Sequence, residues 1–385
     1  MPSADISSLP ILPAGHAGVT RAAELIEQGK LVLLPTETVY GIAVNLASAE
    51  ARAAARAIKS RSAPTGSAPA PWVIHVAQPD DLLAWVPHIS PLGRRLISKS
   101  VPGPVAFQIK MTEEDTHAAQ ERLGAAFDET VQEHWITLRS PDFSQTQDVL
   151  AKIKTPVAII GAGTAAQPGV FELQELPTNL LATEGDNNGV HGILDGGPTR
   201  YRRSSTVVRI EGESYSVARQ GVIDERIIHR FADYTILFLC SGNTCRSPMA
   251  AAIAAKTFAG KLGIEVDDLP LRHIVVQSAG LHASRGMRAT LEAVDAVKEL
   301  GGDLSSHLSQ PTTPDLLRRA DIVYTMTDAH REEVLELFPW AERKTFRLDP
   351  EGDVADPIGL PAAVYHRVAN RLASVIEKRL GELAI

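Results

Sequence analysis

The chain contains little cysteine: among its 385 residues there are only Cys240 and Cys245. A secreted scaffold held together by disulfides would use more cysteines, so this scarcity favours a reducing, cytoplasmic environment. Because both cysteines lie in one short segment, they are better candidates for chemistry than for cross-linking distant parts of the fold.

Long apolar runs and an excess of basic residues are also missing. No stretch approaches the roughly 18 consecutive apolar residues that a membrane helix requires. The opening MPSADISSLP lacks the basic and apolar regions of a secretory signal. The net charge of −8 argues against a generally basic nucleic-acid-binding surface, although a local basic groove is compatible with it. We therefore expect a cytoplasmic protein without membrane contact.

Length and composition predict two globular domains. At roughly 100–200 residues per domain, 385 residues correspond to two domains, and 44% hydrophobic residues suffice for sizeable cores. We expect a flexible lead-in over residues 1–13, a first α/β domain over 14–224, a charged linker over 225–233 and a second α/β domain over 234–385.

The two domains differ in their expected strand patterns. In the first, short apolar runs with helices between several of them predict a twisted sheet; they cover residues 31–34, 72–76, 105–109, 135–138, 157–160 and 206–210. In the second, strands at 235–239, 274–276 and 322–326 alternate with helices from 248, at 289–300 and at 362–380. Such alternation predicts a doubly wound parallel sheet with its site at the carboxyl ends of the strands.

The segment Cys240-Ser-Gly-Asn-Thr-Cys-Arg-Ser-Pro248 follows the first strand of the second domain and opens a helix. Gly242 allows the loop to turn its backbone N–H groups inward, and the helix N-terminus adds positive charge. Arg246, in Cys-x5-Arg spacing, offers a planar fork for two phosphate oxygens. The same field stabilises a thiolate, so Cys240 is predicted to attack phosphorus and form a phosphocysteine. A buried cysteine beside a surface arginine, the bland alternative, would not explain why all these features occur in order.

The second domain resembles the low-molecular-weight phosphatase family. Besides the loop, residues 277–280 (QSAG), 305–307 (SSH), 320–327 with His330, and Asp356-Pro357 stand where that family has its blocks. The resemblance implies a general acid in an Asp-Pro pair, which protonates the leaving group. Asp349-Pro350 is a second such pair, but we favour Asp356 because it immediately precedes the last helix, as in the family. Asp349 is expected to be a turn residue.

The resemblance also implies roles around the loop. Its members Ser241, Gly242, Asn243, Thr244, Cys245 and Ser247 would bind phosphate, with Asn243 and Ser247 orienting the loop and hydrogen-bonding the thiolate. Cys245 is either a partner for a protective disulfide with Cys240 or a space-filling thiol. No metal or other cofactor is expected for the phosphatase, because the loop and Arg246 supply the positive field.

The residues around the loop favour one phosphoryl group. Tyrosine-specific members of the family carry a bulky aliphatic residue where this chain has Thr244, and aromatic residues where it has Ile358 and Gly359. Without an aromatic wall, part of the stacking on a phenol ring is lost. The loop GNTCRS resembles that of protein arginine phosphatases. We therefore predict a phosphorylated protein as substrate, with phosphoarginine preferred over phosphotyrosine.

The first domain carries Pro35-Thr-Glu-Thr-Val-Tyr-Gly41 after a strand, followed by Lys59-Ser-Arg61. With the blocks at 101–104, 138–141, 194–198, 205–208 and 219–221 in the same order, it resembles the YrdC-like threonylcarbamoyl-AMP synthase family. That resemblance implies condensation of threonine, bicarbonate and ATP, with Mg²⁺, for modification of tRNA, and contact with tRNA or double-stranded RNA. The implied ligand-binding residues are Thr36, Thr38, Tyr40, Lys59, Arg61, Arg139, Ser205 and Arg219.

Two positions depart from the pattern of the synthase family. Gly161-Ala-Gly163 replaces a Ser-x-Asn block that touches the nucleotide, and Ala70-Pro71 stands where a lysine is usual. Each lost hydrogen bond to a charged group would remove about 1.5–3 kcal/mol of binding free energy. A competing interpretation therefore remains: a degenerate domain that binds RNA or nucleotide without catalysis.

Overall fold

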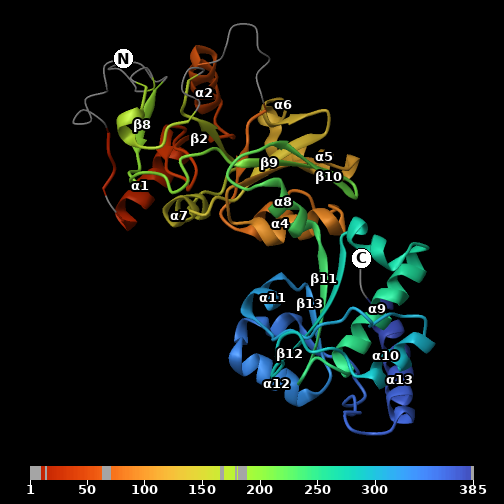
Figure 1. Cartoon of the computed structure of the whole chain (residues 1–385). Helices are drawn as coiled ribbons and strands as arrows, with labels where there is room; N and C mark the ends of the chain where they lie inside the picture. Colours follow the sequence, from red (N-terminus) through yellow and green to blue (C-terminus); the bar gives the residue numbers. More distant parts are fainter. Residues whose placement is uncertain are drawn as a thin grey trace. The chain divides into compact units, whose positions relative to one another are not determined.

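The computed structural model describes residues 10–13, 15–62, 71–164, 169–177, 180 and 189–382, with the side chains of residues 61 and 62 left out. The chain divides into two compact units, which are described separately: unit 1 ends at Ala232 and unit 2 begins at Asp233. Figure 1 labels their elements. No helix in these ranges is long and apolar enough to cross a lipid bilayer.

Unit 1 is built on a mixed sheet that has ten strands within the described ranges. Its order is β10-β9-β4-β6-β3-β7-β2-β1-β8, with β5 beside β6. The strands are β1 (Leu31–Leu34), β2 (Gly41–Asn45), β3 (Ile74–His75), β4 (Val105–Lys110), β5 (Val131–Gln132), β6 (Trp135–Arg139), β7 (Val157–Gly161), β8 (Val190–Ile193), β9 (Thr206–Glu211) and β10 (Ser214–Arg219). β2, β5, β8 and β10 were not among the strands predicted from apolar runs.

The helices of unit 1 cover both faces of this sheet. They are α1 (His16–Glu27), α2 (Ala49–Ser62), α3 (Pro79–Leu83), α4 (Pro91–Ser100), α5 (Glu113–Leu123), α6 (Phe127–Thr130), α7 (Ser144–Lys152) and α8 (Glu225–Ala232), with short 3₁₀ helices η2 (Gly124–Ala126) and η3 (Leu173–Glu175). In β1, Leu31 and Leu33 pack into one apolar cluster, while Val32 and Leu34 pack into another. A strand buried on both faces needs an uninterrupted apolar run, which is what the sequence has there.

Within the predicted linker of residues 225–233, Asp233 begins unit 2, and residues 225–232 form helix α8 of unit 1. Its apolar residues Ile228 and Ala232 are buried, and α8 lies beside α4 in Figure 1. Arg95 of α4 donates from Nε to the carbonyl oxygen of Ala232 at 2.7 Å. The charged residues of the segment made it look like a connector, because its two buried residues lie one helical turn apart and form no apolar run.

Unit 2 confirms the predicted doubly wound parallel sheet. Its strands β11 (Tyr234–Cys240), β12 (Ile274–Gly280), β13 (Ile322–Thr325) and β14 (Thr345–Arg347) are all parallel, in the order β12-β11-β13-β14. Strand order reverses beside β11, so ligands are expected at the carboxyl end of that strand.

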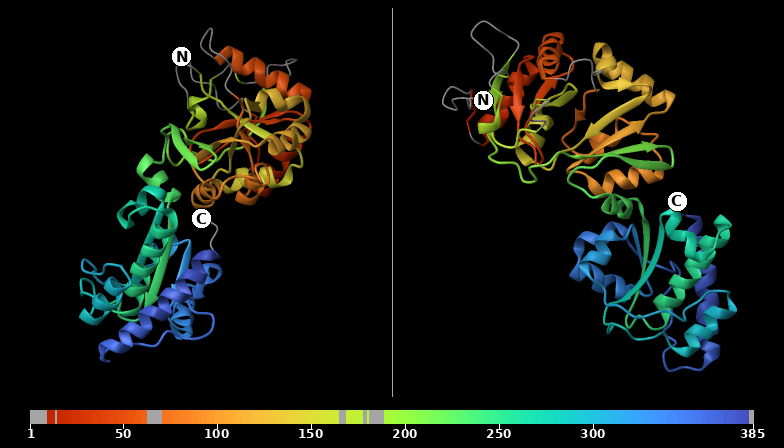
Figure 2. Two further views of the ribbon diagram at one scale, coloured as in Figure 1. Left: turned by 90° about the vertical axis from the view of Figure 1, so that its right-hand side faces the viewer. Right: turned by 45° about the horizontal axis from the view of Figure 1, so that its top comes forward.

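Helices cover the two faces of this second sheet, as Figures 1 and 2 show. One layer contains α9 (Arg246–Leu262), α10 (Leu291–Glu299) and α13 (Ala362–Gly381), and the other contains α11 (Pro314–Arg319) and α12 (Asp328–Leu337). The 3₁₀ helices η5 (Val266–Arg272) and η6 (Pro339–Lys344) complete the unit. Residues of β11 point alternately into the two layers: Phe238 and Cys240 into one, Leu237 and Leu239 into the other.

Candidate active site

A tight loop joins β11 to α9 and runs from Cys240 to Arg246. Asn243 has a φ of 56°, in the left-handed region that asparagine tolerates better than most residues. Gly280, which pairs with Cys240 from β12, leaves room for the loop. A Cβ at position 280 would lie 2.5 Å from the carbonyl oxygen of Ser241 and 2.9 Å from the backbone nitrogen of Asn243. The loop therefore needs a glycine on the neighbouring strand.

The thiol of Cys240 is buried beneath this loop and surrounded by donors. Its Sγ lies 3.0 Å from the hydroxyl oxygen of Ser247, and the backbone N–H of Asn243 donates to it at 3.3 Å. The side chain is only 3% exposed. These two contacts fix the position of the sulfur at the carboxyl end of β11, where the loop leads into the N-terminus of α9.

The side chain of Asn243 connects the loop to the strands and loops around it. Its Nδ2 donates to the hydroxyls of Ser247 and Ser278, each at 2.9 Å, and its Oδ1 accepts the backbone N–H of Gln310 at 2.9 Å. His307 Nε2 lies 2.8 Å from the Asn243 carbonyl oxygen. Ser278 and His307 belong to blocks noted in the sequence, but no role was predicted for them, because their contacts join residues far apart in the chain.

Arg246 and Asp356 meet at the mouth of the loop. Arg246 Nη2 lies 2.5 Å from Asp356 Oδ2; the arginine side chain is 7% exposed and the aspartate side chain 43%. Arg246 also donates to the Val354 carbonyl oxygen at 3.3 Å and to the Ser241 hydroxyl at 3.4 Å. The structure thus brings together the three residues predicted to be catalytic, Cys240, Arg246 and Asp356.

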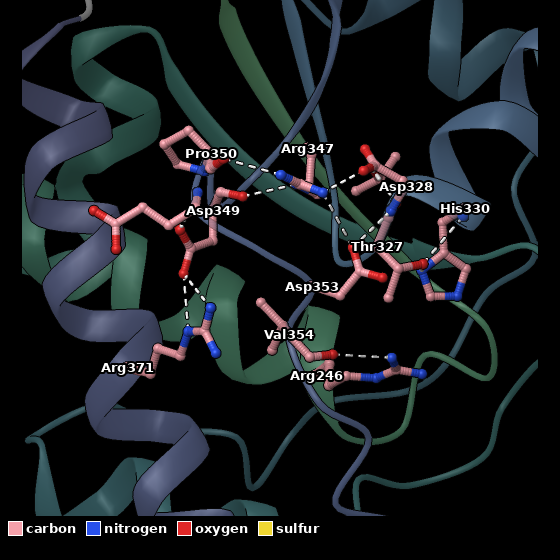
Figure 3. A network of polar contacts seen from close by, with 12 residues as sticks. Arg246, Thr327, Asp328, His330, Arg347, Asp349, Pro350, Asp353, Val354 and Arg371 are labelled. Carbon is pink, nitrogen blue, oxygen red and sulfur yellow. Dashed lines mark hydrogen bonds and ion pairs between the residues drawn. The ribbon is translucent and has the colours of Figure 1, made fainter.

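Asp349, the aspartate of the other Asp-Pro pair, lies in a different environment (Figure 3). It is buried, and Arg371 of α13 donates to its Oδ2 from both Nε and Nη2 at 2.8 Å. Burial raises the pKa of this carboxyl, but the Glu351 N–H and the guanidinium groups of Arg371 and Arg347 outweigh it, and the pKa falls below its ordinary value. A buried carboxylate held in this way acts as an anchor.

His330 is a neighbour of the loop that the sequence predicted only as part of a family block. Its Nε2 lies 2.8 Å from the Ser241 hydroxyl and its Nδ1 2.8 Å from the Thr327 hydroxyl. Burial and the nearby positive charge of Arg246 lower its pKa, despite surrounding carboxylates. A neutral imidazole therefore supports Ser241 at neutral pH.

Cys245 lies in a cluster of hydroxyl groups. Its Sγ is 3.6 Å from the oxygen of Thr290, 3.7 Å from that of Thr244 and 3.8 Å from that of Tyr365. Both cysteines are free thiols in the structure. Whether the pair forms a disulfide on oxidation stays a prediction.

Unit 1 contains a cavity of about 400 Å³ over the middle of its sheet. Five of the predicted ligand-binding residues line it: Thr36, Lys59, Arg139, Ser205 and Arg219. Burial lowers the pKa of Lys59. Burial is also the main cause that lowers the pKa of Arg219, and the positive charge of Arg139 lowers it further. Three cations in one partly buried cavity favour an anionic ligand.

Arg139 lines this cavity and is 5% exposed. Its Nη2 pairs with the buried Glu37 at 2.8 Å and donates to the Thr38 hydroxyl at 2.9 Å. Its Nε is buried without a hydrogen-bond partner among the described residues. His75, on the same cavity, has its pKa lowered to about 3 by burial and by Arg139.

Three predicted ligand-binding residues are not on the cavity wall as described. Tyr40 is fully buried; its hydroxyl donates to the Gly197 carbonyl oxygen at 2.8 Å, and burial is the main cause that raises its pKa to about 12. The Thr38 hydroxyl is occupied by Arg139 and Thr36. The side chain of Arg61 lies outside the described part of the chain.

Family models match both parts of the chain. The model described as "Low molecular weight phosphotyrosine protein phosphatase" matches residues 235–384. The Sua5/YciO/YrdC model, described as "Telomere recombination", matches residues 24–221.

Named relatives match unit 2. The chain is 37% identical over 150 residues to the protein-arginine-phosphatase of Geobacillus stearothermophilus, covering 38% of this chain and 93% of that protein. It is 35% identical over 153 residues to the protein-arginine-phosphatase of Bacillus subtilis strain 168, covering 38% of this chain and 95% of that protein. It is 35% identical over 125 residues to the probable low molecular weight protein-tyrosine-phosphatase EpsP of Ralstonia nicotianae, covering 32% of this chain and 77% of that protein. The chain therefore belongs to the Sua5/YciO/YrdC family through residues 24–221 and to the low molecular weight phosphatase family through residues 235–384.

Proposed function

We propose that unit 2 removes phosphoryl groups from proteins through a covalent phosphocysteine on Cys240. The observation that carries this proposal is the meeting of a buried thiol, a guanidinium and a carboxylate around one loop at the carboxyl end of β11. A thiolate nucleophile, a phosphate ligand and a proton donor are the groups that such a displacement requires.

In the first step, the Cys240 thiolate attacks phosphorus. The S–P bond forms as the bond to the leaving oxygen or nitrogen breaks, and a protonated Asp356 gives that atom its proton. In the second step, water attacks phosphorus, the S–P bond breaks and Asp356 accepts a proton from the water. Ser247 and the Asn243 N–H receive the thiolate again, because both contact Sγ.

Arg246 would change partners when substrate binds. In the free protein its Nη2 is paired with Asp356. A phosphate oxygen carries more charge and competes for the same donor, since a guanidinium binds phosphate with two parallel hydrogen bonds. Substrate binding would thus free the Asp356 carboxyl to face the leaving group.

Phosphoarginine is the proposed substrate group, ahead of phosphotyrosine. Thr244 offers a polar side chain in the loop. Ile358, which follows Asp356-Pro357, is 61% exposed, and because it is aliphatic the phenol ring of a phosphotyrosine could not stack on an aromatic side chain at this position. Two relatives named protein-arginine-phosphatases agree with this choice, while the EpsP relative keeps phosphotyrosine as the alternative.

The substrate is tested with matched peptides that carry phosphoarginine or phosphotyrosine, using the full-length chain. We expect faster release of phosphate from phosphoarginine, and a shift toward phosphotyrosine in Thr244→Ile. Much faster cleavage of phosphotyrosine by the unmodified chain would refute the preference. Cys240→Ser should abolish turnover and Asp356→Asn should slow phosphorylation of the enzyme; activity retained by Cys240→Ser would refute the mechanism itself.

For unit 1 we propose threonylcarbamoyl-AMP synthesis from threonine, bicarbonate and ATP, for tRNA modification. The support is the cavity lined by Lys59, Arg139 and Arg219. The Nε of Arg139 is buried and has no hydrogen-bond partner among the described residues. These cations fit a triphosphate, and Mg²⁺ would enter bound to ATP and neutralise part of its charge. The same domain is proposed to contact tRNA or double-stranded RNA, and the protein to act in the cytoplasm.

One observation favours a second candidate, a binding domain without catalysis. Gly161 lies on the cavity wall, and the space where its Cβ would stand has no neighbour within 4 Å. A side chain at position 161 would therefore fit into the cavity. The packing of the protein does not require glycine there, and glycine offers a ligand no side-chain contact. Pyrophosphate release by full-length Cys240→Ser protein decides between the two: release that depends on both threonine and bicarbonate supports the synthase, and none from folded protein supports the binding domain.

A further inference from the structure

Both Asp-Pro pairs of unit 2 lie on one irregular loop that passes the phosphate loop. It runs over residues 348–361, from the end of β14 to the start of α13, without helix or strand. Its position therefore depends on individual contacts. Those contacts decide where the Asp356 carboxyl lies.

Arg347, the last residue of β14, holds the first half of this loop (Figure 3). Its Nε donates to the carbonyl oxygen of Asp349 and its Nη2 to that of Pro350, both at 2.9 Å. Its Nη1 pairs with the carboxylates of Asp328 and, at 3.5 Å, Asp353. One side chain, 23% exposed, thus joins three residues of the loop to the first residue of α12.

The second half of the loop is tied to the same place. Asp353 Oδ1 accepts the backbone N–H of Asp328 at 2.9 Å. Val354 is buried; its N–H donates to the Met326 carbonyl oxygen at 2.9 Å, and its carbonyl oxygen accepts from Arg246. Asp356 follows two residues later, so a displacement of Asp353 and Val354 moves its carboxyl.

We propose that Arg347 is a positioning residue for proton transfer by Asp356, acting through its bonds to Asp349, Pro350 and Asp353. This inference rests on the proposed phosphatase function. A general acid must lie within about 2.6–3.2 Å of the atom that it protonates, and a misplacement of about 1 Å can cost roughly 100-fold in rate. All three nitrogens of the guanidinium are used, which a lysine ammonium cannot reproduce.

The leaving group provides the test, measured on the full-length chain. Phenyl phosphate releases phenol, with a pKa of about 10, and needs the acid. The nitro group of p-nitrophenyl phosphate stabilises the departing phenolate, so this substrate needs the acid less. Arg347→Ala should lower kcat/KM for phenyl phosphate by about tenfold or more, and for p-nitrophenyl phosphate by a much smaller factor. Arg347→Lys should fall between Arg347→Ala and the unmodified chain.

A double variant separates positioning from general damage. If Arg347 acts through Asp356, then Arg347→Ala combined with Asp356→Asn should be no slower than Asp356→Asn alone. Equal losses on both aryl phosphates, or losses that multiply in the double variant, would overturn the inference.

Two further variants keep the test sharp. Arg319→Ala removes an exposed arginine that pairs with Asp315 one helical turn away, and it should keep the rates of the unmodified chain. If Arg347→Ala does not fold, Asp353→Asn removes one ion pair of the same set and should show the same dependence on the leaving group. Failure of the proposed function itself looks different: the unmodified chain would be inactive, or Cys240→Ser would remain active.

Discussion

Replacement of Asn243 tests how the phosphate loop is held in shape. The side chain is fully buried and makes three hydrogen bonds, to Ser247, Ser278 and Gln310. At about 1 kcal/mol net for each bond, Asn243→Gly should lower the free energy of unfolding of unit 2 by about 3 kcal/mol. Glycine tolerates the φ of 56°, so this variant adds no backbone strain; lost side-chain packing and the larger entropy of the unfolded glycine chain add to the loss of the hydrogen bonds.

Asn243→Ala removes the same three bonds and adds backbone strain. The left-handed conformation costs alanine roughly 1–2 kcal/mol, of which the smaller entropy of the unfolded alanine chain returns a part. We therefore expect the alanine variant to be about 1 kcal/mol less stable than the glycine variant. The order of stability should be asparagine, glycine, alanine.

The assay is hydrogen exchange of β11 peptides in the full-length chain, measured by mass spectrometry over a urea series. This readout follows unit 2 without removing unit 1. If Asn243→Gly were as stable as the unmodified chain, the hydrogen bonds would contribute nothing to stability. If Asn243→Ala matched Asn243→Gly, the strain argument would be wrong.

Three other perturbations have defined outcomes. Gly280→Ala places a Cβ 2.5 Å from the Ser241 carbonyl oxygen, so it should lower kcat/KM and destabilise unit 2 by about 1–3 kcal/mol. Gly260→Ala is the control, because a Cβ there has no neighbour within 4 Å, and it should have neither effect. Equal activities of the two variants would contradict the packing argument. His75 has a pKa near 3 when folded and about 6.5 when unfolded, so unit 1 should lose up to about 1.4 kcal/mol per pH unit as pH falls between these values. Urea midpoints by tryptophan fluorescence should show a smaller loss for His75→Gln, and an unchanged slope would contradict the assignment. The pKa of Asp349 is lowered in the folded chain, so this carboxylate stabilises unit 2 above about pH 4, and the stabilisation is lost as pH falls through the folded pKa. Arg371→Ala should reduce this loss of stability in acid, measured by hydrogen exchange of unit 2. An unaltered pH profile would show that the Asp349–Arg371 pair contributes little.

The loop from Cys240 to Arg246 could be recognised because its sequence motif is contiguous, although Gly280, which leaves room for it, lies on another strand. The apolar strand, the Cys-x5-Arg spacing and the following helix are all local, and local order can be read from a sequence; the left-handed residue of the turn, however, is Asn243, and Gly242 has no positive φ. The parallel sheet of unit 2 followed from the same kind of information, since strands buried on both faces need continuous apolar runs.

Tertiary structure decided what depends on residues far apart in the chain. The two Asp-Pro pairs look alike locally, but only folding places Asp356 on Arg246 and Asp349 on Arg371. Tyr40 has the sequence context of a ligand-binding residue, yet its hydroxyl is bonded to the Gly197 carbonyl oxygen more than 150 positions away. In both cases the hydrogen-bond or ion-pair partner of the side chain is distant in sequence, and no local pattern of residue types contains that partner.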